Sequence, residues 1–433
     1  MAEMYSGRYD AAPAALLTAA RTVTGLDAGL GRAMMFEALQ AVLIAGPPEL
    51  VRSVSAAPAD PPTYADRFRA GYRARDAGDH RAAVPSLRAA LNALAASGPS
   101  TVDGLPRAAI SLFTADDLWD DRAGRRAWKR LHAVERTGGA LGPLRTTLLV
   151  GSLWELRAGR FTAAAALQDE AAELGGRVDS GYRMELLAWS GREDEARATA
   201  TDDAAPAVLE IALGRYPEAL AGLLPAFEGD RPGVAHRALP DIVEAGVRSG
   251  DHRAAMAALT RMEERARISE TDWGLGLLAR CQALMTDDEP AETWYRESTE
   301  RLARTRIVTE LARSHLLLGE WLRRRRRRVD ARAELRTAVD LFTTMGAAAF
   351  AERARTELLA TSERPRRRND QAADELTPQE KQIAGLAATG CSNSEIAARL
   401  VISVSTVEYH LTRVFRKLAV SSRRKLAAAL TST

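Results

Sequence analysis

Apolar and charged residues are interspersed along most of this chain of 433 residues. Alanine and leucine dominate residues 1–360, with Arg, Glu and Asp between them and few runs of β-branched residues. Such a composition favours helices over strands. Near the end of the region, Leu335, Ala338, Val339 and Phe342 have the spacing of one helix face. The sequence therefore predicts an all-α fold.

A six-residue pattern recurs in this region. Each copy begins with Gly followed by Arg or Asp and has Ala in the sixth place. The glycines are Gly7, Gly78, Gly159, Gly191, Gly214 and Gly250, and the alanines are Ala12, Ala83, Ala164, Ala196, Ala219 and Ala255. Glycine can end a helix with a positive φ, the polar residues can form the turn, and the small alanine lets a second helix pack closely against the first. The pattern predicts helical hairpins.

The clearest spacings between copies are 32, 23 and 36 residues, and the gaps of 71 and 81 residues would each hold two irregular units. Repeats of about 34 residues are typical of tetratricopeptide solenoids. Residues 1–360 resemble such repeats in degenerate form, and we expect a solenoid here. The alternative is that the pattern arises by chance in an alanine-rich helical protein.

Two basic segments follow the last copy. Arg323–Arg328 is a run of six arginines, which could bind nucleic acid or form the solvated or acid-paired part of a helix, and we favour the second interpretation. After Leu359 the apolar spacing stops, and residues 361–373 contain Pro365 and four arginines. This composition predicts a linker whose arginines would add phosphate contacts.

Residues 374–433 predict a separate domain of four short helices. Thr377 and Glu380, and then Ser392 and Glu395, have the spacing of capping boxes, and Gly390 would end the first helix. The apolar faces of the first two helices are predicted to consist of Ile383, Leu386, Ala387, Ile396, Ala397 and Leu400. The fourth helix is expected at about 422–430.

The third helix, at about 404–418, is the most informative. Its predicted core stripe contains Val407, Leu411, Val414, Phe415 and Leu418. The opposite face carries Ser405, Tyr409, Thr412 and Arg416, flanked by Glu408, His410 and Arg413. A helix in the major groove needs such donors and acceptors for base edges, and cations for phosphates.

Four segments carry a resemblance to the LuxR-type helix-turn-helix: 375–380, 390–397, 402–411 and 416–423. The resemblance implies a helix-turn-helix at about 392–411, a third helix that enters the major groove and a fourth that supports dimerisation. The DNA-binding residues that it implies are Ser405, Thr406, Glu408, Tyr409, His410, Thr412, Arg413, Arg416 and Lys417. Glu408, Tyr409 and Thr412 would face base edges, and the others would contact the backbone or orient the helix.

Glu408 departs from the family pattern, because many members have Lys there. A carboxylate cannot hold a phosphate, but it can accept a hydrogen bond from a cytosine amino group. Alternatively it caps the helix or pairs within the domain, an interpretation that we slightly favour. For His410, an internal packing role and a DNA-binding role remain equally open.

The stretch 316–360 is similar to the end of the helical region in large actinobacterial regulators of the LAL group, which carry an ATPase domain before their repeats. A P-loop needs Gly-Lys followed by Ser or Thr. None of the four lysines, Lys129, Lys381, Lys417 and Lys425, follows a glycine. We therefore expect no ATP hydrolysis, and a chain that corresponds to the C-terminal half of such a regulator, as a natural short form or a fragment.

The sequence gives little support to other functional classes. The six histidines are scattered, and Cys281 and Cys391 lack metal-ligand spacing, so we expect no enzyme, cofactor or metal. Strands and acidic clusters of a phosphoacceptor domain are also missing. No apolar run approaches the length of a membrane span, and the N-terminus does not resemble a secretory signal. We expect a cytoplasmic protein that is associated with the nucleoid when bound to DNA.

Charge is distributed unevenly along the chain. Residues 365–433 carry 11 Lys and Arg against 6 Asp and Glu, whereas residues 1–364 carry 49 against 51. The basic excess thus coincides with the predicted DNA-binding domain. We expect a transcription regulator that binds double-stranded DNA as a homodimer, contacts RNA polymerase, and senses a small-molecule or peptide effector through its repeats. The alternative is an interaction scaffold whose C-terminal domain binds a protein.

Overall fold

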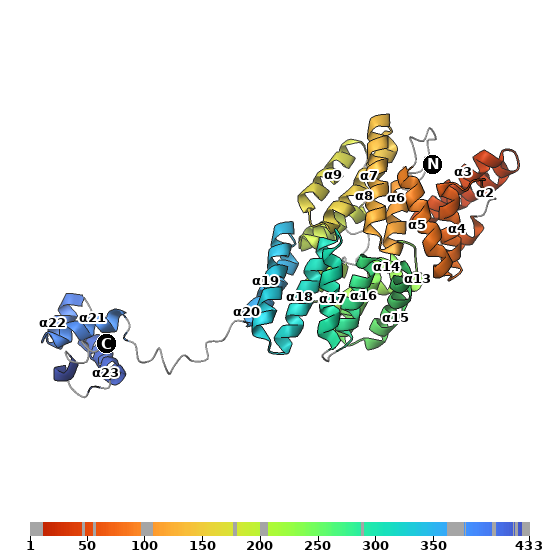
Figure 1. Ribbon diagram of the computed structural model, residues 1–433. Helices are drawn as coiled ribbons and strands as arrows, with labels where there is room; N and C mark the ends of the chain where they lie inside the picture. Colours follow the sequence, from red (N-terminus) through yellow and green to blue (C-terminus); the bar gives the residue numbers. More distant parts are fainter. Residues whose placement is uncertain are drawn as a thin grey trace. The chain divides into compact units, whose positions relative to one another are not determined.

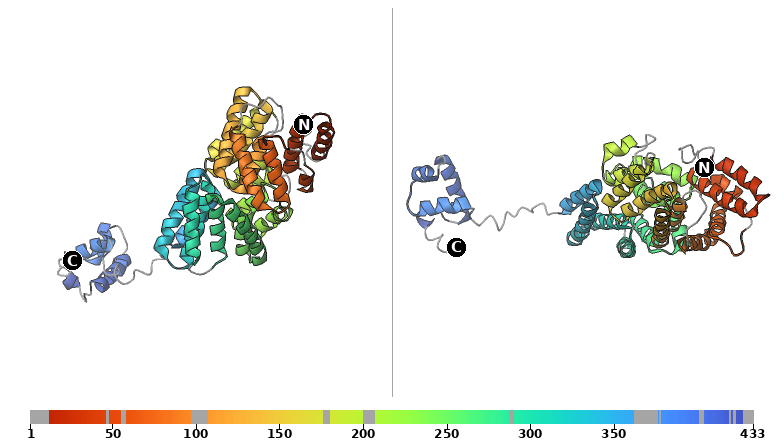
Figure 2. Two further views of the ribbon diagram at one scale, coloured as in Figure 1. Left: turned by 45° about the vertical axis from the view of Figure 1, so that its right-hand side comes forward. Right: turned by 90° about the horizontal axis from the view of Figure 1, so that it is seen from above.

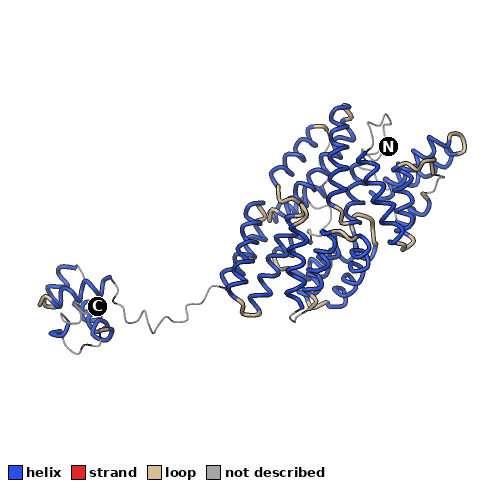
Figure 3. Tube along the Cα trace, viewed as in Figure 1, coloured by secondary structure: helices blue, strands red, loops and turns tan. Residues whose placement is uncertain are grey.

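The structure, a computed structural model, describes residues 12–45, 48–54, 58–96, 107–175, 180–199, 207–286, 290–361, 376, 378–400, 404–418, 420 and 423–426. The chain divides into two compact units, Met1–Thr361 and Ser362–Thr433. We call them the helical-repeat unit and the C-terminal unit. Within the described ranges every regular element is a helix, so the prediction of an all-α fold is confirmed (Figure 3).

The helical-repeat unit consists of consecutive helices, and short turns join many of those that the structure describes (Figure 1). Its elements are α2 (Ala12–Thr24), α3 (Ala28–Ala45), η1 (Pro48–Ser53), α4 (Tyr64–Asp76), α5 (His80–Ala96), α6 (Arg107–Leu118), α7 (Asp121–Gly138), α8 (Leu141–Arg157), α9 (Phe161–Glu173), α10 (Ser180–Trp189), α11 (Glu193–Thr199), α12 (Ala207–Ala212), α13 (Tyr216–Gly229), α14 (Ala235–Ser249), α15 (His252–Ser269), α16 (Asp272–Leu284), α17 (Pro290–Ala303), α18 (Val308–Arg324), α19 (Arg328–Met345) and α20 (Ala348–Thr361). None of the described helices is long and apolar enough to cross a membrane.

The predicted hairpins form at the recurring pattern. Five of its glycines, at positions 78, 159, 191, 214 and 250, lie between two helices with φ between 71° and 88°. The alanine in the sixth place of each of these copies is at most 1% exposed. Each small alanine therefore lies where the second helix packs against the first. The copy at Gly7 lies outside the described residues, and the likeness to tetratricopeptide repeats stays a prediction.

Two further turns have the same geometry without a glycine. Trp119 and Arg326 have φ values of 47° and 63°, and the N–H groups of both residues donate to the carbonyl three positions back. The next N–H in each turn donates five positions back, as at Gly78. A side chain in this left-handed conformation costs about 1 kcal/mol or more. The six arginines therefore span the last residues of α18, the turn at 325–327 and the first residue of α19, and they do not lie in one helix.

Part of the arginine run is paired with acids, as the favoured interpretation requires. Arg323 Nε lies 2.5 Å from Oε2 of Glu357 in α20. Arg327 pairs with Asp330 at 2.6 Å and with Glu292 of α17. These contacts join the turn to α17, α19 and α20.

The last helices of the unit pack against much earlier ones (Figures 1 and 2). Thr309 Oγ1 of α18 donates to the carbonyl of Arg157 at the end of α8, at 3.3 Å. Arg353 Nη1 of α20 donates to the carbonyl of Ile211 in α12, at 3.2 Å. At Gly191, an added Cβ would lie 2.7 Å from the backbone nitrogen of Ala349, so this contact requires a glycine. The chain thus folds back on itself inside this unit.

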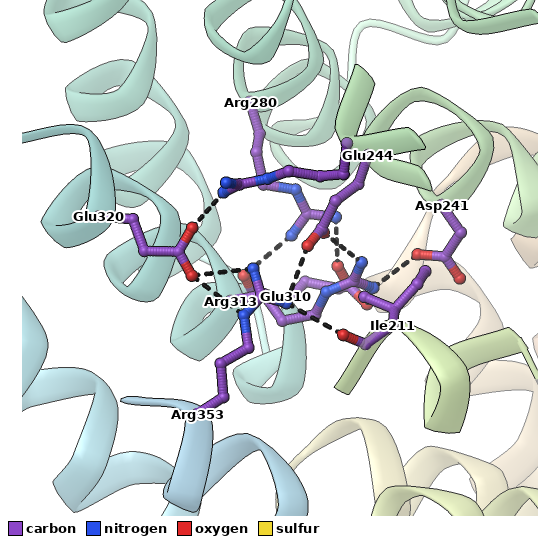
Figure 4. A network of polar contacts seen from close by, with 9 residues as sticks. Ile211, Asp241, Glu244, Arg280, Glu310, Arg313, Glu320 and Arg353 are labelled. Carbon is purple, nitrogen blue, oxygen red and sulfur yellow. Dashed lines mark hydrogen bonds and ion pairs between the residues drawn. The ribbon is translucent and has the colours of Figure 1, made fainter. Parts of the chain in front are cut away.

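A buried network of charged side chains fills the region where these helices meet (Figure 4). Arg313 of α18 contacts Asp241 at 2.6 Å and Glu244 at 2.7 Å, both on α14. Arg353 of α20 contacts Glu244 at 3.1 Å and Glu320 of α18 at 2.8 Å. Arg248 pairs with Glu320, and Arg280 of α16 pairs with Glu310 at 2.6 Å. The four positive charges of these arginines are thus matched by the four negative charges of the carboxylates.

The balance of charge holds Glu244 in its ionised form. Burial raises the pKa of Glu244, but the guanidinium groups of Arg313 and Arg353 lower it by more than burial raises it. The pKa of Glu244 therefore lies well below its ordinary value of 4.5. The folded state therefore gains stability from Glu244 above pH 4.5 and loses it progressively as the pH falls below that value.

The C-terminal unit contains α21 (Pro378–Ala388), α22 (Asn393–Leu400), α23 (Val404–Lys417) and the short η2 (Arg423–Lys425). Its core consists of Leu376, Ile383, Ala384, Ala387, Ile396, Ala397, Val407, Leu411, Val414 and Leu426, with Leu386, Leu400, Phe415 and Leu418 packed against it. The apolar faces predicted for the first three helices are therefore confirmed.

We expect Glu244→Gln to destabilise the helical-repeat unit by about 3 to 5 kcal/mol, because it leaves Arg313 and Arg353 buried with less compensating charge. All seven tryptophans of the chain lie between Trp119 and Trp321, so their fluorescence in urea reports on this unit alone. Glu263→Gln is the matched control, because its exposed pair with Arg267 should contribute less than about 1 kcal/mol. Equal effects of the two substitutions would contradict a structural role for the network.

Candidate nucleic-acid interface

The turn after α21 positions the next two helices. Gly390 ends α21 with φ of 95°, and its N–H donates to the carbonyl of Ala387 at 3.2 Å. The N–H of Cys391 donates to the carbonyl of Leu386 at the same distance. A residue with a Cβ would be strained in this left-handed conformation. The glycine therefore allows α22 to start directly after the turn.

A capping box starts α22, as the sequence predicts. The backbone N–H and the hydroxyl of Ser392 both donate to Glu395 Oε2, at 2.7 and 2.9 Å. In return, the backbone N–H of Glu395 donates to Ser392 Oγ at 3.3 Å. These hydrogen bonds from Ser392 lower the pKa of Glu395. Of the other predicted box, Glu380 is buried, and Thr377 lies outside the described residues.

One side of α23 packs into the core of the C-terminal unit. Val407 and Val414 are fully buried, and Leu411 is 4% exposed. They share a hydrophobic cluster with Ile383 of α21 and Ile396 of α22. Because these three positions fix the rotation of α23 about its axis, positions on the other side must face away from the core.

The exposed side of α23 includes Glu408 and Thr412. Thr412 Oγ1 donates to the carbonyl of Glu408 at 2.9 Å, so its hydroxyl oxygen remains available as an acceptor. Among the contacts of the described residues, the Glu408 carboxylate has no hydrogen bond or ion pair. The internal pairing that we favoured from the sequence is therefore not seen among the described residues, and the role of Glu408 stays a prediction.

The other candidate residues differ in how far the structure describes them. His410 is half-buried. The backbone of Ser405, Thr406, Tyr409, Arg413, Arg416 and Lys417 belongs to α23, while their side chains lie outside the described residues. Positions 405, 409, 412 and 416 follow one another at steps of three or four residues, so they lie along one side of the helix.

Arg423 has a structural role that the sequence analysis did not assign. Its Nη1 donates to Asn393 Oδ1 at 2.7 Å, its Nη2 donates to the carbonyl of Cys391, and its Nε donates to the carbonyl of Ala387 at 3.4 Å. One guanidinium thus binds the end of α21, the turn and the start of α22. Of the fourth helix predicted at about 422–430, the structure describes residues 423–426, which comprise the short η2 and the buried Leu426. Its other residues lie outside the described part of the chain.

Helices α22 and α23 pack against each other and against α21, as in a helix-turn-helix domain, and comparison with known proteins agrees. Residues 401–403 between α22 and α23 lie outside the described residues. Residues 374–430 match the family described as bacterial regulatory proteins, luxR family. The C-terminal unit therefore contains a luxR-family domain, and the resemblance to the LuxR-type helix-turn-helix is confirmed.

Relatives with this domain are named as transcription regulators. The chain is 39% identical over 84 residues to the HTH-type transcriptional regulator Mb0914c of Mycobacterium bovis, which covers 19% of this chain and 9% of that protein. It is 25% identical over 244 residues to the HTH-type transcriptional regulator MalT of Serratia proteamaculans, covering 45% of this chain and 26% of MalT. The matched segments thus span about a tenth and about a quarter of these relatives.

We expect Arg423→Ala to loosen the C-terminal unit, because it leaves two carbonyls and the Asn393 side chain without their charged donor. Hydrogen bonds to a charged group contribute about 1.5 to 3 kcal/mol, so the amides of α22 should exchange with solvent about 10- to 100-fold faster. Hydrogen exchange measured by mass spectrometry checks this, with the exposed Lys425→Ala as control. Unchanged exchange in α22 would show that the guanidinium does not hold the turn.

Proposed function

We propose that the chain is a sequence-specific DNA-binding transcription regulator whose α23 enters the major groove. The observation that carries the proposal is the two-sided character of α23. Val407, Leu411 and Val414 bury one side, while Glu408 and Thr412 are exposed on the other. The major groove is about 12 Å wide and admits one α-helix. The luxR-family match and the names of the relatives support the same function.

We assign base-edge contacts to Glu408, Tyr409 and Thr412. A carboxylate accepts from the N4 amino group of cytosine, and the exposed Glu408 is available for this contact. We assign contacts to phosphates, or roles in orienting the helix, to Ser405, Thr406, His410, Arg413, Arg416 and Lys417. These assignments rest on the resemblance to the family and on the position of each residue in α23.

The rest of the proposal concerns partners. The family resemblance supports a homodimer on DNA and contact with RNA polymerase, and a regulator of this class acts in the cytoplasm, at the nucleoid. The helical-repeat unit would receive the signal, a small molecule or a peptide, because helical repeats commonly bind such ligands. Nothing in the proposal requires an enzymatic activity.

Replacing Tyr409, Thr412 and Arg416 together with Ala should abolish sequence-specific binding, because it removes groups that we assign to bases and phosphates. The measurement is fluorescence anisotropy with a duplex that the unmodified chain selects from a random pool. Circular dichroism should show unchanged helix content, and hydrogen exchange measured by mass spectrometry should show that α21 and α22 keep their protection. If the triple variant bound the selected duplex undiminished, the assignment of α23 would be wrong.

Arg416→Ala alone should weaken binding to all duplexes about equally and reduce the slope of log K against log salt by about one unit, because it removes one phosphate contact. Lys381→Ala, which removes an exposed charge on α21, serves as the control and should leave the slope unchanged. If the unmodified chain retarded no duplex even at low salt, the alternative of a protein-interaction scaffold would replace the proposal.

A further inference from the structure

The turn between α18 and α19 carries a cluster of exposed arginines. Of the six arginines at 323–328, Arg323 pairs with Glu357, and Arg327 pairs with Glu292 and Asp330. The exposed residues Arg324, Arg326 and Arg328, which lie around this turn, form what we call the arginine turn.

Within the described part of the chain, no carboxylate pairs with Arg324, Arg326 or Arg328. Arg325 lies over the ring of Trp321, with its guanidinium carbon 5.4 Å from the ring centroid. Exposed like charges so close in the sequence repel one another, and a polyanion would relieve this repulsion.

The backbone at Arg326 gives an independent reason to look for a ligand. Five other turns of this unit place glycine where Arg326 stands, and Arg326 has φ of 63°. Glycine would remove the strain, and the arginine side chain is exposed and makes no ion pair within the described residues. No ion pair of Arg326 within the described residues offsets this strain, which favours a role in binding a group outside the folded unit.

The arginine turn lies beside the end of the helical-repeat unit. Arg323 binds Glu357 of α20, and Arg332 Nη2 of α19 donates to the carbonyl of Thr361 at 2.9 Å. Only residues 362–375 separate Thr361 from Leu376 of the C-terminal unit. A chain of this length spans at most about 50 Å when fully extended.

We infer that the arginine turn is a second DNA-binding surface, which contacts the phosphate backbone of the duplex that α23 reads. The inference rests on the proposed function, because α23 brings the duplex within reach of the tethered turn. Guanidinium groups bind phosphate oxygens in pairs of hydrogen bonds, and each contact releases a counterion. Contacts of this kind extend the footprint along the duplex without reading its sequence.

The test uses the full chain and an arbitrary duplex of about 40 base pairs, with affinity measured by fluorescence anisotropy between low and moderate salt. The variant R324Q/R326G/R328Q removes three charges, and its glycine suits the left-handed turn. The control R67Q/R73Q/R81Q removes the same charge from α4 and α5, which lie away from α18 and α19 in the same unit (Figures 1 and 2). Tryptophan fluorescence verifies that both variants are folded.

The variant in the arginine turn should bind at least about tenfold more weakly than the unmodified chain, with a salt slope lower by about two to three units. The control should stay within about twofold, with its slope unchanged. If both variants bind like the unmodified chain, the turn does not contact DNA, and an acidic protein partner becomes the better explanation. Equal losses in both variants would also overturn the inference, since general charge would explain them. Failure of the unmodified chain to bind any duplex would instead overturn the proposed function.

Discussion

The burial of one side of α23 is the constraint on which the function of this protein depends. A domain as small as the C-terminal unit has few core residues, so Val407, Leu411 and Val414 are needed for the fold itself. Once they are buried, the helix cannot rotate, and the positions that face solvent are fixed. The surface offered to a ligand is thus determined by the packing beneath it.

The neighbouring helices keep this surface in place by local hydrogen bonds. Gly390 turns the chain, Ser392 and Glu395 cap α22, and Arg423 ties the turn to both helices. Each of these groups acts on backbone or on a helix end, and none needs to touch a ligand. Rigid support of this kind reduces the conformational entropy that a helix loses when it binds a ligand.

The helical-repeat unit is organised by a different principle. Left-handed turns and small alanines bring successive helices together, and then the buried charges join helices that are far apart in the sequence. Arg313 and Glu244 are separated by 69 positions, and Arg353 and Ile211 by 142. Since isolated buried charges are costly, the network holds this arrangement only while every partner is present.

How far the sequence predicts this structure depends on the range of each interaction. The apolar faces of α21, α22 and α23 and the Ser392–Glu395 box are local, so helical spacing was sufficient to predict them. The turns at Trp119 and Arg326 could not be predicted from a pattern defined by glycine, although buried Ala331 follows Arg326 at the usual spacing. The charged network and the contacts of Arg423 join distant segments, and no spacing in a single sequence reveals such partners.

Methylation interference tests the central claim most directly, because dimethyl sulfate marks the two grooves differently. It methylates guanine at N7 in the major groove and adenine at N3 in the minor groove, both of which are atoms that proteins read. With a duplex selected by the unmodified chain, our account predicts that methylated guanines within the site block binding. Interference confined to adenines, or none at all, would contradict the placement of α23 in the major groove.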